Sequence, residues 1–258
     1  MSLLEVKNIT KRFGGLLAVD DVSIRVEEGE IVSVIGPNGA GKTTFFNMLT
    51  GVYSVTHGEI LFDGKELHHL TPQQIVDMGM ARTFQNLRLF QDMRVIENVL
   101  VGFHAKVKYT FLDALFRTSR FRKEEAALHR EAIAILSSIG LADKLDSYAV
   151  NLPYGDQKRL EIARAIATRA RLLLLDEPAA GMNPQESEEL LQFINSLRTQ
   201  GYTIVLIEHD MNVVMKISDR IYVLDHGKLI AEGLPAEIST NQAVIDAYLG
   251  KEEEQDHA

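Results

Sequence analysis

The sequence contains no cysteine, which excludes disulfides and thiolate metal sites and suits a cytosolic protein. Long apolar stretches are absent as well, because the four consecutive leucines at 172–175 fall far short of the ~20 residues that span a bilayer. Residues 1–6 lack a basic segment and a cleavage site, so we expect no secretory signal. No repeat, low-complexity segment or Gly/Ser linker divides the 258 residues, and 46% of them are hydrophobic, enough for a sizeable core.

An excess of positive charge is also missing. The net charge is −9, and four acidic residues near the C-terminus account for four of these charges, leaving −5 for the body. An acidic body argues against nucleic-acid binding as the main function. The four residues are Glu252, Glu253, Glu254 and Asp256, and we expect residues 251–258 to form a frayed, solvated tail.

The most informative feature present is a glycine-rich loop, Gly36-Pro-Asn-Gly-Ala-Gly-Lys-Thr-Thr44. It follows the apolar residues 31–35 and precedes the helix-like residues 45–50, which is the setting of a phosphate-binding GxxxxGK[ST] loop. Glycines let successive N–H groups surround an anion, and the helix adds its positive dipole end. Lys42 would reach the β- and γ-phosphates, and the Thr43 hydroxyl would hold Mg²⁺. The context disfavours the alternative, a glycine-rich turn beside a surface lysine, so the loop predicts binding of a nucleoside triphosphate.

Apolar and helical patterns alternate along the chain. Residues 3–35 are predicted as strands, and a further β segment at 58–64 ends in an Asp-Gly turn. Buried strands are predicted at 172–176 and 203–209, and apolar strands that alternate with helices imply a parallel sheet covered on both faces. From about residue 86 to 151 the pattern is helical, which predicts a helical insertion into this core. Further predicted elements are helices at 158–168 and 185–200 and hairpin strands at 221–224 and 229–231.

Two carboxylates follow the apolar residues 172–175. Asp176 is expected at the C-terminal end of its strand, where α/β sheets bind ligands, and within reach of Mg²⁺. Glu177 comes next and could turn toward a γ-phosphate as a general base. The alternative is that the pair caps a helix before Pro178, but the upstream loop favours the catalytic interpretation.

Two further polar residues stand where a γ-phosphate or a metal could be sensed. His209 follows the buried segment 203–207, where it is either a γ-phosphate contact or a cap, and its place after a core strand favours the contact. Gln85 ends the run Ala81-Arg-Thr-Phe-Gln85, and its amide could touch Mg²⁺ or water, or merely end a strand.

The order of these motifs resembles the nucleotide-binding subunits of ABC transporters. That family runs phosphate loop, glutamine loop, signature, acidic strand end with a catalytic glutamate, D-loop and switch histidine, and all six occur here in that order. The resemblance implies an α/β fold: a P-loop NTPase core, mainly a parallel sheet flanked by helices, with an antiparallel β subdomain and an inserted α-helical subdomain. It implies one domain over 3–250, with the core at 3–85 and 152–235, the insertion at 86–151 and a C-terminal extension at 236–250.

The same resemblance implies ATP and Mg²⁺ as cofactors and assigns roles to matched positions. Phe13 would stack on adenine, although its residue type also fits a core aromatic near a strand end. The expected catalytic residues are Glu177, His209 and Gln85, and the expected metal ligands are Thr43, Gln85 and Asp176. The expected nucleotide contacts are Phe13, Gly36, Pro37, Asn38, Gly39, Ala40, Gly41, Lys42, Thr43 and Thr44.

The signature segment departs from the family pattern Leu-Ser-Gly-Gly-Gln. Pro153 removes a hydroxyl and an N–H that would face a γ-phosphate, and Asp156 replaces the glutamine. The D-loop, usually Ser-Ala-Leu-Asp, is Ala180-Gly-Met-Asn183. In this family the signature completes the site of the opposite subunit, so the departures concern the partner's site and would suit a heterodimer of two ATPases. The signature residues are Leu152, Pro153, Tyr154, Gly155, Asp156 and Gln157.

Segments 82–90, 154–157, 176–184 and 244–250 resemble one subgroup, the ATP-binding subunits of branched-chain amino-acid importers. The stretch 103–122 fits that subgroup's enlarged helical subdomain. It carries cations among aromatics, and we interpret it as a solvated helical surface without lipid contact. The cations in and beside it are Lys106, Lys108, Arg117, Arg120, Arg122 and Lys123.

The resemblance also implies partners and a location at the cytoplasmic face of the cell membrane. Membrane-spanning permease subunits are expected to dock near residues 86–101, a second ATPase subunit would complete a homo- or heterodimer, and a periplasmic or extracellular solute-binding protein would act indirectly. We therefore expect an ATP-hydrolysing subunit that powers an importer of branched-chain amino acids, without nucleic-acid partners.

One alternative is a soluble ABC ATPase, although those usually carry coiled-coil inserts or two fused ATPase domains. Another is an ABC ATPase for a different solute, such as lipid or lipopolysaccharide, whereas a P-loop kinase or GTPase would lack the signature.

Overall fold

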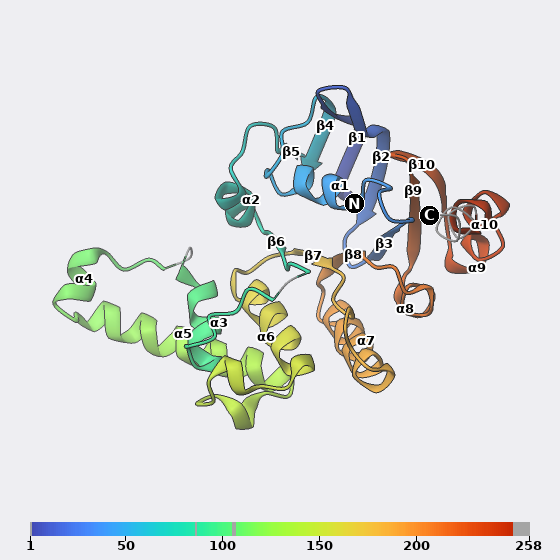
Figure 1. Ribbon diagram of the computed structural model, residues 1–258. Coiled ribbons are helices and arrows are strands. Elements are labelled where there is room, and N and C mark those ends of the chain that lie inside the picture. Colours follow the sequence, from blue (N-terminus) through green and yellow to red (C-terminus); the bar gives the residue numbers. More distant parts are fainter. Residues whose placement is uncertain (1, 86, 105–106, 250–258) are drawn as a thin grey trace.

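The computed structural model describes residues 2–85, 87–104 and 107–249, and the expectations for Asn86, Lys106 and the tail at 251–258 lie outside them. The described residues form a six-stranded and a four-stranded sheet with helices around them (Figure 1). The strands are β1 (Ser2–Phe13), β2 (Leu16–Glu27), β3 (Ile31–Ile35), β4 (His57–Phe62), β5 (Lys65–Glu66), β6 (Met80–Arg82), β7 (Leu172–Asp176), β8 (Thr203–Ile207), β9 (Arg220–Asp225) and β10 (Lys228–Gly233). The helices are α1 (Lys42–Leu49), α2 (Pro72–Met78), α3 (Val95–Gly102), α4 (Phe111–Leu115), α5 (Ser119–Ser138), α6 (Tyr154–Ala167), α7 (Pro184–Thr199), α8 (Met211–Ile217), α9 (Pro235–Ile238) and α10 (Gln242–Leu249).

The six-stranded sheet has the order β10-β9-β3-β8-β7-β6, and its neighbouring strands are parallel except for β9 and β10. Along β7, Leu172 and Leu174 belong to the core shared with α1 and the antiparallel sheet. Leu173 and Leu175 belong to the core shared with α6 and α7. Successive side chains point to opposite faces, so a strand buried on both faces must be apolar throughout. The predicted P-loop core with a mainly parallel sheet is confirmed.

The four-stranded sheet is antiparallel in the order β2-β1-β4-β5. On β2, Val22, Ile24 and Val26 are buried and the polar residues between them are exposed, as their alternation predicts. The hairpin between β4 and β5 turns at Asp63 and Gly64, which both have positive φ, the conformation that an Asp-Gly turn provides. The predicted antiparallel β subdomain is therefore confirmed.

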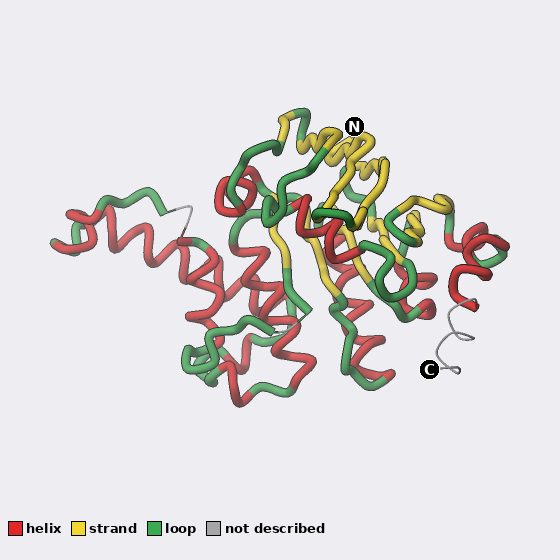
Figure 2. The backbone as a smooth tube through the Cα atoms, turned by 45° about the horizontal axis from the view of Figure 1, so that its top comes forward, coloured by secondary structure: helices red, strands yellow, loops and turns green. Residues whose placement is uncertain are grey.

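The helical region, which comprises α3, α4 and α5, lies beside the body next to α6 (Figure 1). Helix α5 runs outward and α4 lies at its far end, as Figure 2 shows from another side. Of the 20 residues of α5, only Leu128, Ala132 and Leu136 are buried, one per turn on the side that meets the body. Within the described residues, no helix combines the length and apolar character needed to cross a membrane.

Several boundaries differ from those that the sequence predicts. Helix α6 begins at Tyr154 rather than at 158, because Pro153 fits the position before a helix but not its interior. Residues 154–157 of the signature segment therefore form the first turn of this helix. Helices α2, α8, α9 and α10 were not predicted, since their four to eight residues are too few for a clear helical period. Helix α2 nevertheless carried a local signal, the capping box of Thr71 and Gln74.

Candidate nucleotide site

The phosphate loop at 36–44 joins β3 to α1, and close backbone neighbours enforce two of its glycines. A Cβ atom on Gly36 would lie 2.0 Å from the carbonyl oxygen of Leu224, and one on Gly41 would lie 2.5 Å from that of Ala18. Both glycines have positive φ. No side chain of the described residues caps the N-terminus of α1. This helix end therefore suits an anion as its cap.

Lys42, the first residue of α1, folds back over the loop. Its Nζ donates hydrogen bonds to the carbonyl oxygens of Gly36, at 2.6 Å, and Pro37, at 3.1 Å. Oxygens of a bound phosphate can accept the same ammonium protons with a stronger, charge-assisted bond. Thr43 stands exposed at the same helix end. The loop has glycines where no Cβ atom would fit, the N-terminus of α1 has no side-chain cap, and the Lys42 ammonium lies over the loop. These three features together fit a triphosphate group.

Asp176, at the end of β7, is paired with a cation that the sequence analysis did not single out. Its Oδ2 lies 2.6 Å from Nη2 of Arg82, and the two side chains are 8% and 6% exposed. Arg82 also donates to Asn47 Oδ1 at 2.7 Å, so it joins the strand end to α1. The pair arises because β6 and β7 are parallel neighbours. Breaking a buried ion pair is costly, so Arg82 fixes the position of Asp176.

No cluster of three or more His, Cys, Asp or Glu side chains forms a closed metal site in the described part of the chain. Asp176 and the hydroxyl of Thr43 are two of the three protein oxygens expected to hold a metal, and the third belongs to the amide of Gln85, whose Nε2 donates to Glu177. Mg²⁺ commonly takes one or two protein oxygens together with substrate phosphates and water. The donor set present therefore fits Mg²⁺ bound with a nucleotide.

Two of the three predicted catalytic side chains converge on the carboxylate of the third. Glu177 Oε2 accepts a hydrogen bond from Gln85 Nε2 at 2.8 Å and lies 3.7 Å from His209 Nδ1. Glu177 and His209 meet because β7 and β8 are parallel neighbours, and the Glu177 N–H donates to the carbonyl of Ile207 at 2.9 Å. Glu177 has a φ of 47°, a left-handed conformation that is unusual for a non-glycine residue and often marks a functional site.

The structure contradicts the capping alternatives for these residues. No helix among the described residues starts directly after Glu177, and α7 is capped instead by Asn183, which accepts from the N–H of Glu186 at 2.9 Å. Helix α8 is capped by Asp210 rather than His209, whose side chain is 58% exposed. Both Glu177 and His209 are therefore left for other contacts.

Two buried charged residues behind the site were missed in the sequence. Glu208 is 1% exposed and accepts the N–H of Ala179 at 2.9 Å, which fixes the turn that follows Glu177. Burial raises the pKa of Glu208. Lys158 on α6 is 2% exposed and donates to the carbonyl of Gln85 at 3.0 Å, so it ties the signature helix to the glutamine loop. Burial lowers the pKa of Lys158.

Phe13 ends β1 at the surface. It is 40% exposed, so the core alternative for this residue is wrong. Tyr53 meets it edge-on, with ring centroids 5.2 Å apart, and Lys11 Nζ lies 5.0 Å from the Phe13 ring. Two aromatic rings and a cation at one edge of the sheet form a surface suited to a nucleobase.

The signature residues bond within their own region of the chain. The Tyr154 hydroxyl donates to the carbonyl of Ala180 in the D-loop at 3.1 Å. Asp156 accepts from Lys144 Nζ at 2.6 Å. Pro153, the residue before α6, is exposed and provides no side-chain cap. Among the described residues no hydrogen bond links this segment to the phosphate loop, so the structure does not bring the two motifs together within the chain.

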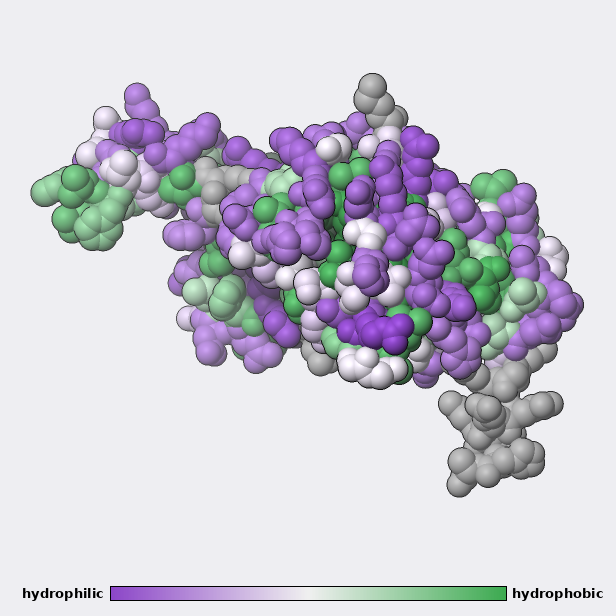
Figure 3. All heavy atoms as spheres, turned by 90° about the horizontal axis from the view of Figure 1, so that it is seen from above, coloured by the Kyte–Doolittle hydropathy of each residue, from purple (hydrophilic) through white to green (hydrophobic). Residues whose placement is uncertain are grey.

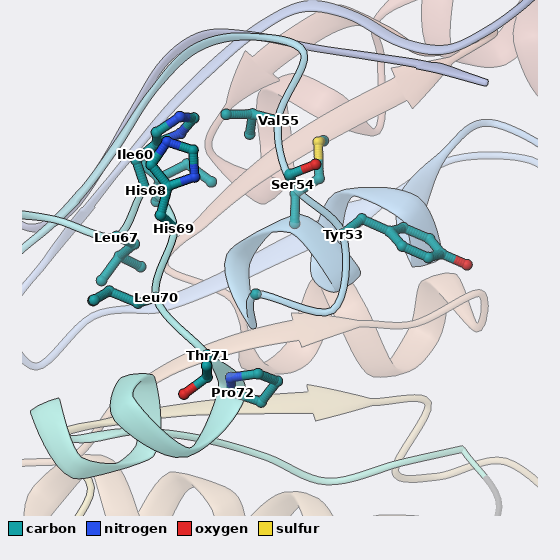
Figure 4. Close-up of a pocket in the computed structure, with 12 residues that line it drawn as sticks. Tyr53, Ser54, Val55, Ile60, Leu67, His68, His69, Leu70, Thr71 and Pro72 are labelled. Atoms are coloured by element: carbon teal, nitrogen blue, oxygen red, sulfur yellow. The ribbon is translucent and has the colours of Figure 1, made fainter. Parts of the chain in front are cut away.

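A cavity of about 260 Å³ lies at the other end of α1 (Figure 4). Its lining includes Met48, Ile60 and Leu67, and the rings of His68 and His69 lie 3.8 Å apart at its edge. The ring of Tyr53 points away from the cavity (Figure 4). None of its lining residues belongs to the phosphate loop or the acidic strand end, so the cavity is separate from the phosphate-binding part of the site and borders the nucleobase surface only through Tyr53.

The C-terminal helix packs under the strand that delivers the phosphate loop. Val244 and Tyr248 of α10 join the same apolar cluster as Ile35, the residue before Gly36. Burial raises the pKa of the Tyr248 hydroxyl, and the nearby backbone of Gly36 opposes this shift. The sequence predicted an extension here but not its place beside the loop.

Comparisons with known proteins agree with this geometry. A family model described as ABC transporter matches residues 19–180, and one described as branched-chain amino acid ATP-binding cassette transporter matches residues 228–254. The chain is 52% identical over 250 residues to the high-affinity branched-chain amino acid transport ATP-binding protein LivG of Salmonella typhimurium, covering 96% of this chain and 98% of that protein. It is 49% identical, with the same coverage, to the corresponding protein BraF of Pseudomonas aeruginosa.

Solved structures give the same result. The ADP conformation of an ATP-binding cassette of an ABC transporter matches with a TM-score of 0.85 and 33% identity, covering 97% of this chain and 99% of that one. A dimeric post-hydrolysis cassette bound to ADP and Pi matches with a TM-score of 0.73 and 26% identity, covering 90% and 98%.

Proposed function

Because this chain belongs to the ABC transporter family, we propose that it is the ATP-hydrolysing subunit of an importer of branched-chain amino acids. The observation that carries the hydrolytic part is the convergence of Gln85 and His209 on the carboxylate of Glu177. The names of relatives that share about half of its residues over nearly their whole length support the solute class. The match of residues 228–254 supports it independently.

In this proposal each group at the strand ends has one task. The loop N–H groups and Lys42 bind the phosphates, and Phe13 supports the adenine. Mg²⁺, held by Thr43 and Asp176, would offset charge on the β- and γ-phosphates. Glu177 accepts a proton from the attacking water, while Gln85 and His209 hold that carboxylate and water in place.

The proposal includes a second ATPase subunit. The signature segment of this chain would complete the partner's site, and the missing hydroxyl at Pro153 makes a heterodimer the favoured arrangement. Closure of the pair around ATP would favour one conformation of the membrane subunits, since nucleotide shifts an equilibrium only by binding one state better.

Permease subunits would dock on the side of the molecule where the helical region meets the body. A groove of about 470 Å³ lies there between α2, α3 and α6, lined by Gln73, Val101, His104 and Arg164 among others. The groove overlaps the end of the stretch at 86–101, where the family resemblance implies that permease subunits dock. The proposal also places the subunit at the cytoplasmic face of the membrane, with an external solute-binding protein as an indirect partner. It divides the chain into a core at 3–85 and 152–235, an insertion at 86–151 and an extension at 236–250.

Reconstitution tests the whole proposal. The chain would be co-expressed with the membrane subunits that co-purify with it and placed in vesicles, and uptake of radiolabelled leucine would be followed. We expect uptake that depends on ATP and disappears in Lys42→Ala. Hydrolysis without uptake of any branched-chain amino acid would overturn the solute class, and purification with a ribosome or DNA complex would overturn the transport role.

A further inference from the structure

Helix α4 exposes four large apolar side chains at the far end of α5. Phe111, Leu112, Leu115 and Phe116 are 80%, 61%, 61% and 73% exposed. Their spacing places them on one face of the helix and its last turn. In Figure 3 they form a green patch at the outermost end of the molecule, and we call them the apolar tip. Contiguous apolar surface on a protein marks an interaction site.

Polar contacts on the inner side hold the apolar tip in its exposed position. The Thr110 hydroxyl accepts the N–H of Asp113 at 3.3 Å, and the Thr118 hydroxyl donates to the Asp113 carboxylate at 2.9 Å. Tyr109 packs edge-on against Phe121, with ring centroids 4.9 Å apart. The polar groups of this segment therefore serve its own fold, and the apolar groups are left to face outward.

Positive charge surrounds the apolar tip. Residues 107–125 contain five basic and three acidic residues, a net charge of +2 in a chain whose net charge is −9. Glu124 accepts the N–H of Lys108 at 2.6 Å, and Glu125 accepts the Tyr109 hydroxyl at 2.8 Å. Within the described residues none of the five forms an ion pair, and two of them donate instead to uncharged backbone carbonyls, Arg120 to Lys108 at 2.7 Å and Arg122 to Arg117 at 3.0 Å. Apart from Arg120, which also interacts electrostatically with Asp113, their charge is therefore available to an anionic surface. The five are Lys108, Arg117, Arg120, Arg122 and Lys123, all exposed.

Apolar and aromatic side chains beside an excess of cations are the combination that enters the headgroup region of an anionic bilayer. We propose that the apolar tip and its surrounding cations bind the surface of an anionic lipid bilayer beside the membrane subunits. Two observations favour a bilayer over a folded protein as the occupant. The tip protrudes at the end of an outstretched helix (Figures 1 and 2), where a fluid surface can adapt to its shape. The positive charge around the tip complements the negative charge of anionic lipid, whereas an apolar pocket on a protein would offer these cations no partner.

The location of the apolar tip agrees with this proposal. Val101 and His104 line the groove in which we place the permease contact, and the chain leads from there to α4. The inference rests on the membrane-transporter part of the proposed function and is independent of the solute. It revises the interpretation of 103–122 as a solvated surface, because four large apolar side chains gain nothing from contact with water.

A fluorophore at the tip provides the first test. Because the 258 residues contain no cysteine, Leu115→Cys creates a unique site for an environment-sensitive dye. Vesicles of equal parts phosphatidylcholine and phosphatidylglycerol, without nucleotide, should shift its emission to shorter wavelength, and salt should weaken the shift. The matched control is Leu234→Cys, at a residue that is 56% exposed and lies before α9, and it should give no shift. No shift at the tip, or an equal shift with pure phosphatidylcholine, would overturn the proposal.

Sedimentation with the same vesicles provides the second test. The double variant Phe111→Ser, Phe116→Ser should bind at least about tenfold more weakly, and Arg117→Gln with Lys123→Gln should weaken binding by a smaller factor. Leu234→Ser should bind like the unaltered chain. Since α4 buries no residue, the variants should unfold at an unchanged temperature. If the phenylalanine variant sediments with the vesicles as well as the unaltered chain does, lipid binding is refuted. Lipid binding is refuted as well if the variant keeps its vesicle binding but loses its association with the membrane subunits in detergent. Neither result depends on hydrolysis or leucine uptake, so they do not bear on the proposed function.

Discussion

The two surfaces that this chain would contribute to nucleotide sites, the strand ends of the α/β body and the signature segment beside the helical region, differ in how firmly they are held. In the body, Lys42, Asp176 and Glu208 are at most 8% exposed and bonded to backbone atoms or to a buried partner. In the signature segment, Pro153 and Tyr154 face solvent. A buried polar group that loses its partner pays the full desolvation cost, whereas water replaces a lost contact at the surface.

This difference separates two kinds of task. Proton transfer and phosphate binding need atoms held at hydrogen-bonding distance, which the ends of β3, β7 and β8 provide. Contacts with another subunit or a bilayer need accessible side chains, which α4, α5 and the first turn of α6 provide. Substitutions in the body should therefore have large effects and substitutions in the helical region small ones.

The largest effect is expected at Glu177. Glu177→Gln keeps the shape of the side chain and its hydrogen bond to Gln85 but removes the proton acceptor, so turnover should fall about 10²-fold to 10⁴-fold while ATP still binds. Phosphate release and nucleotide binding would be measured on the same protein. Glu188→Gln, at a side chain on α7 that is 48% exposed, is the control and should leave both unchanged. Normal turnover in Glu177→Gln would exclude this residue as the base.

The second effect is expected at Gly36. In Gly36→Ala the new Cβ would collide with the carbonyl of Leu224, so the free energy of unfolding should fall by about 3 kcal/mol or more. Gly140 also has positive φ, 75°, but has no atom within 4 Å of its Cβ position. Gly140→Ala should therefore cost only the backbone strain, about 1–2 kcal/mol. Denaturant unfolding of both variants measures the difference, and equal losses would contradict the close approach at Gly36.

Contiguous motifs explain why so much of the body could be predicted. In residues 36–44 and 172–177 the strand, the loop and the chemical groups are neighbours in sequence, so local patterns identify both element and site. The missed contacts join distant residues: 94 positions separate Arg82 from Asp176, and 73 separate Lys158 from Gln85. Only the sheet order and helix packing bring such pairs together. The outward face of α4 was not predictable for a similar reason, because spacing shows an apolar face but not whether another element covers it.

A third, intermediate effect is expected at Lys158, which links the two regions. Burial raises the pKa of Glu161 above its ordinary value of 4.5, and the Lys158 ammonium opposes this shift. The stability that such a carboxyl contributes is complete below pH 4.5 and is lost as the pH rises through the raised pKa. Lys158→Met should lower the free energy of unfolding by about 2 kcal/mol at neutral pH and steepen its decline above pH 4.5.

The surface pair of Lys216 and Glu188 is the control for this prediction. Their charged atoms are 2.8 Å apart, but the side chains are 61% and 48% exposed, so Lys216→Met should change stability by less than about 1 kcal/mol. Thermal unfolding of both variants over a series of pH values makes the comparison. If the two variants lose the same free energy of unfolding at every pH, Lys158 contributes no more to stability than a surface cation does.

The smallest effect is expected at Pro153, where the site would be shared between subunits. Pro153→Ser restores a hydroxyl and an N–H before α6, and one added hydrogen bond to the γ-phosphate is worth about 1 kcal/mol, or roughly fivefold in rate. Serine is also a favourable N-cap, so the isolated chain should gain about 1 kcal/mol of stability. Turnover by the two-subunit complex and unfolding of the single chain separate these two gains.

Combining Pro153→Ser with Glu177→Gln assigns the gain to one site. Glu177→Gln silences the site on this chain, so any turnover left in the complex belongs to the partner's site, which the signature of this chain would complete. In a heterodimer the added Pro153→Ser should raise that remaining turnover. In a homodimer both sites carry Glu177→Gln, and no turnover remains for the serine to raise. A remaining turnover that does not respond to the serine would mean that the exposed first turn of α6 makes no contact in the closed pair.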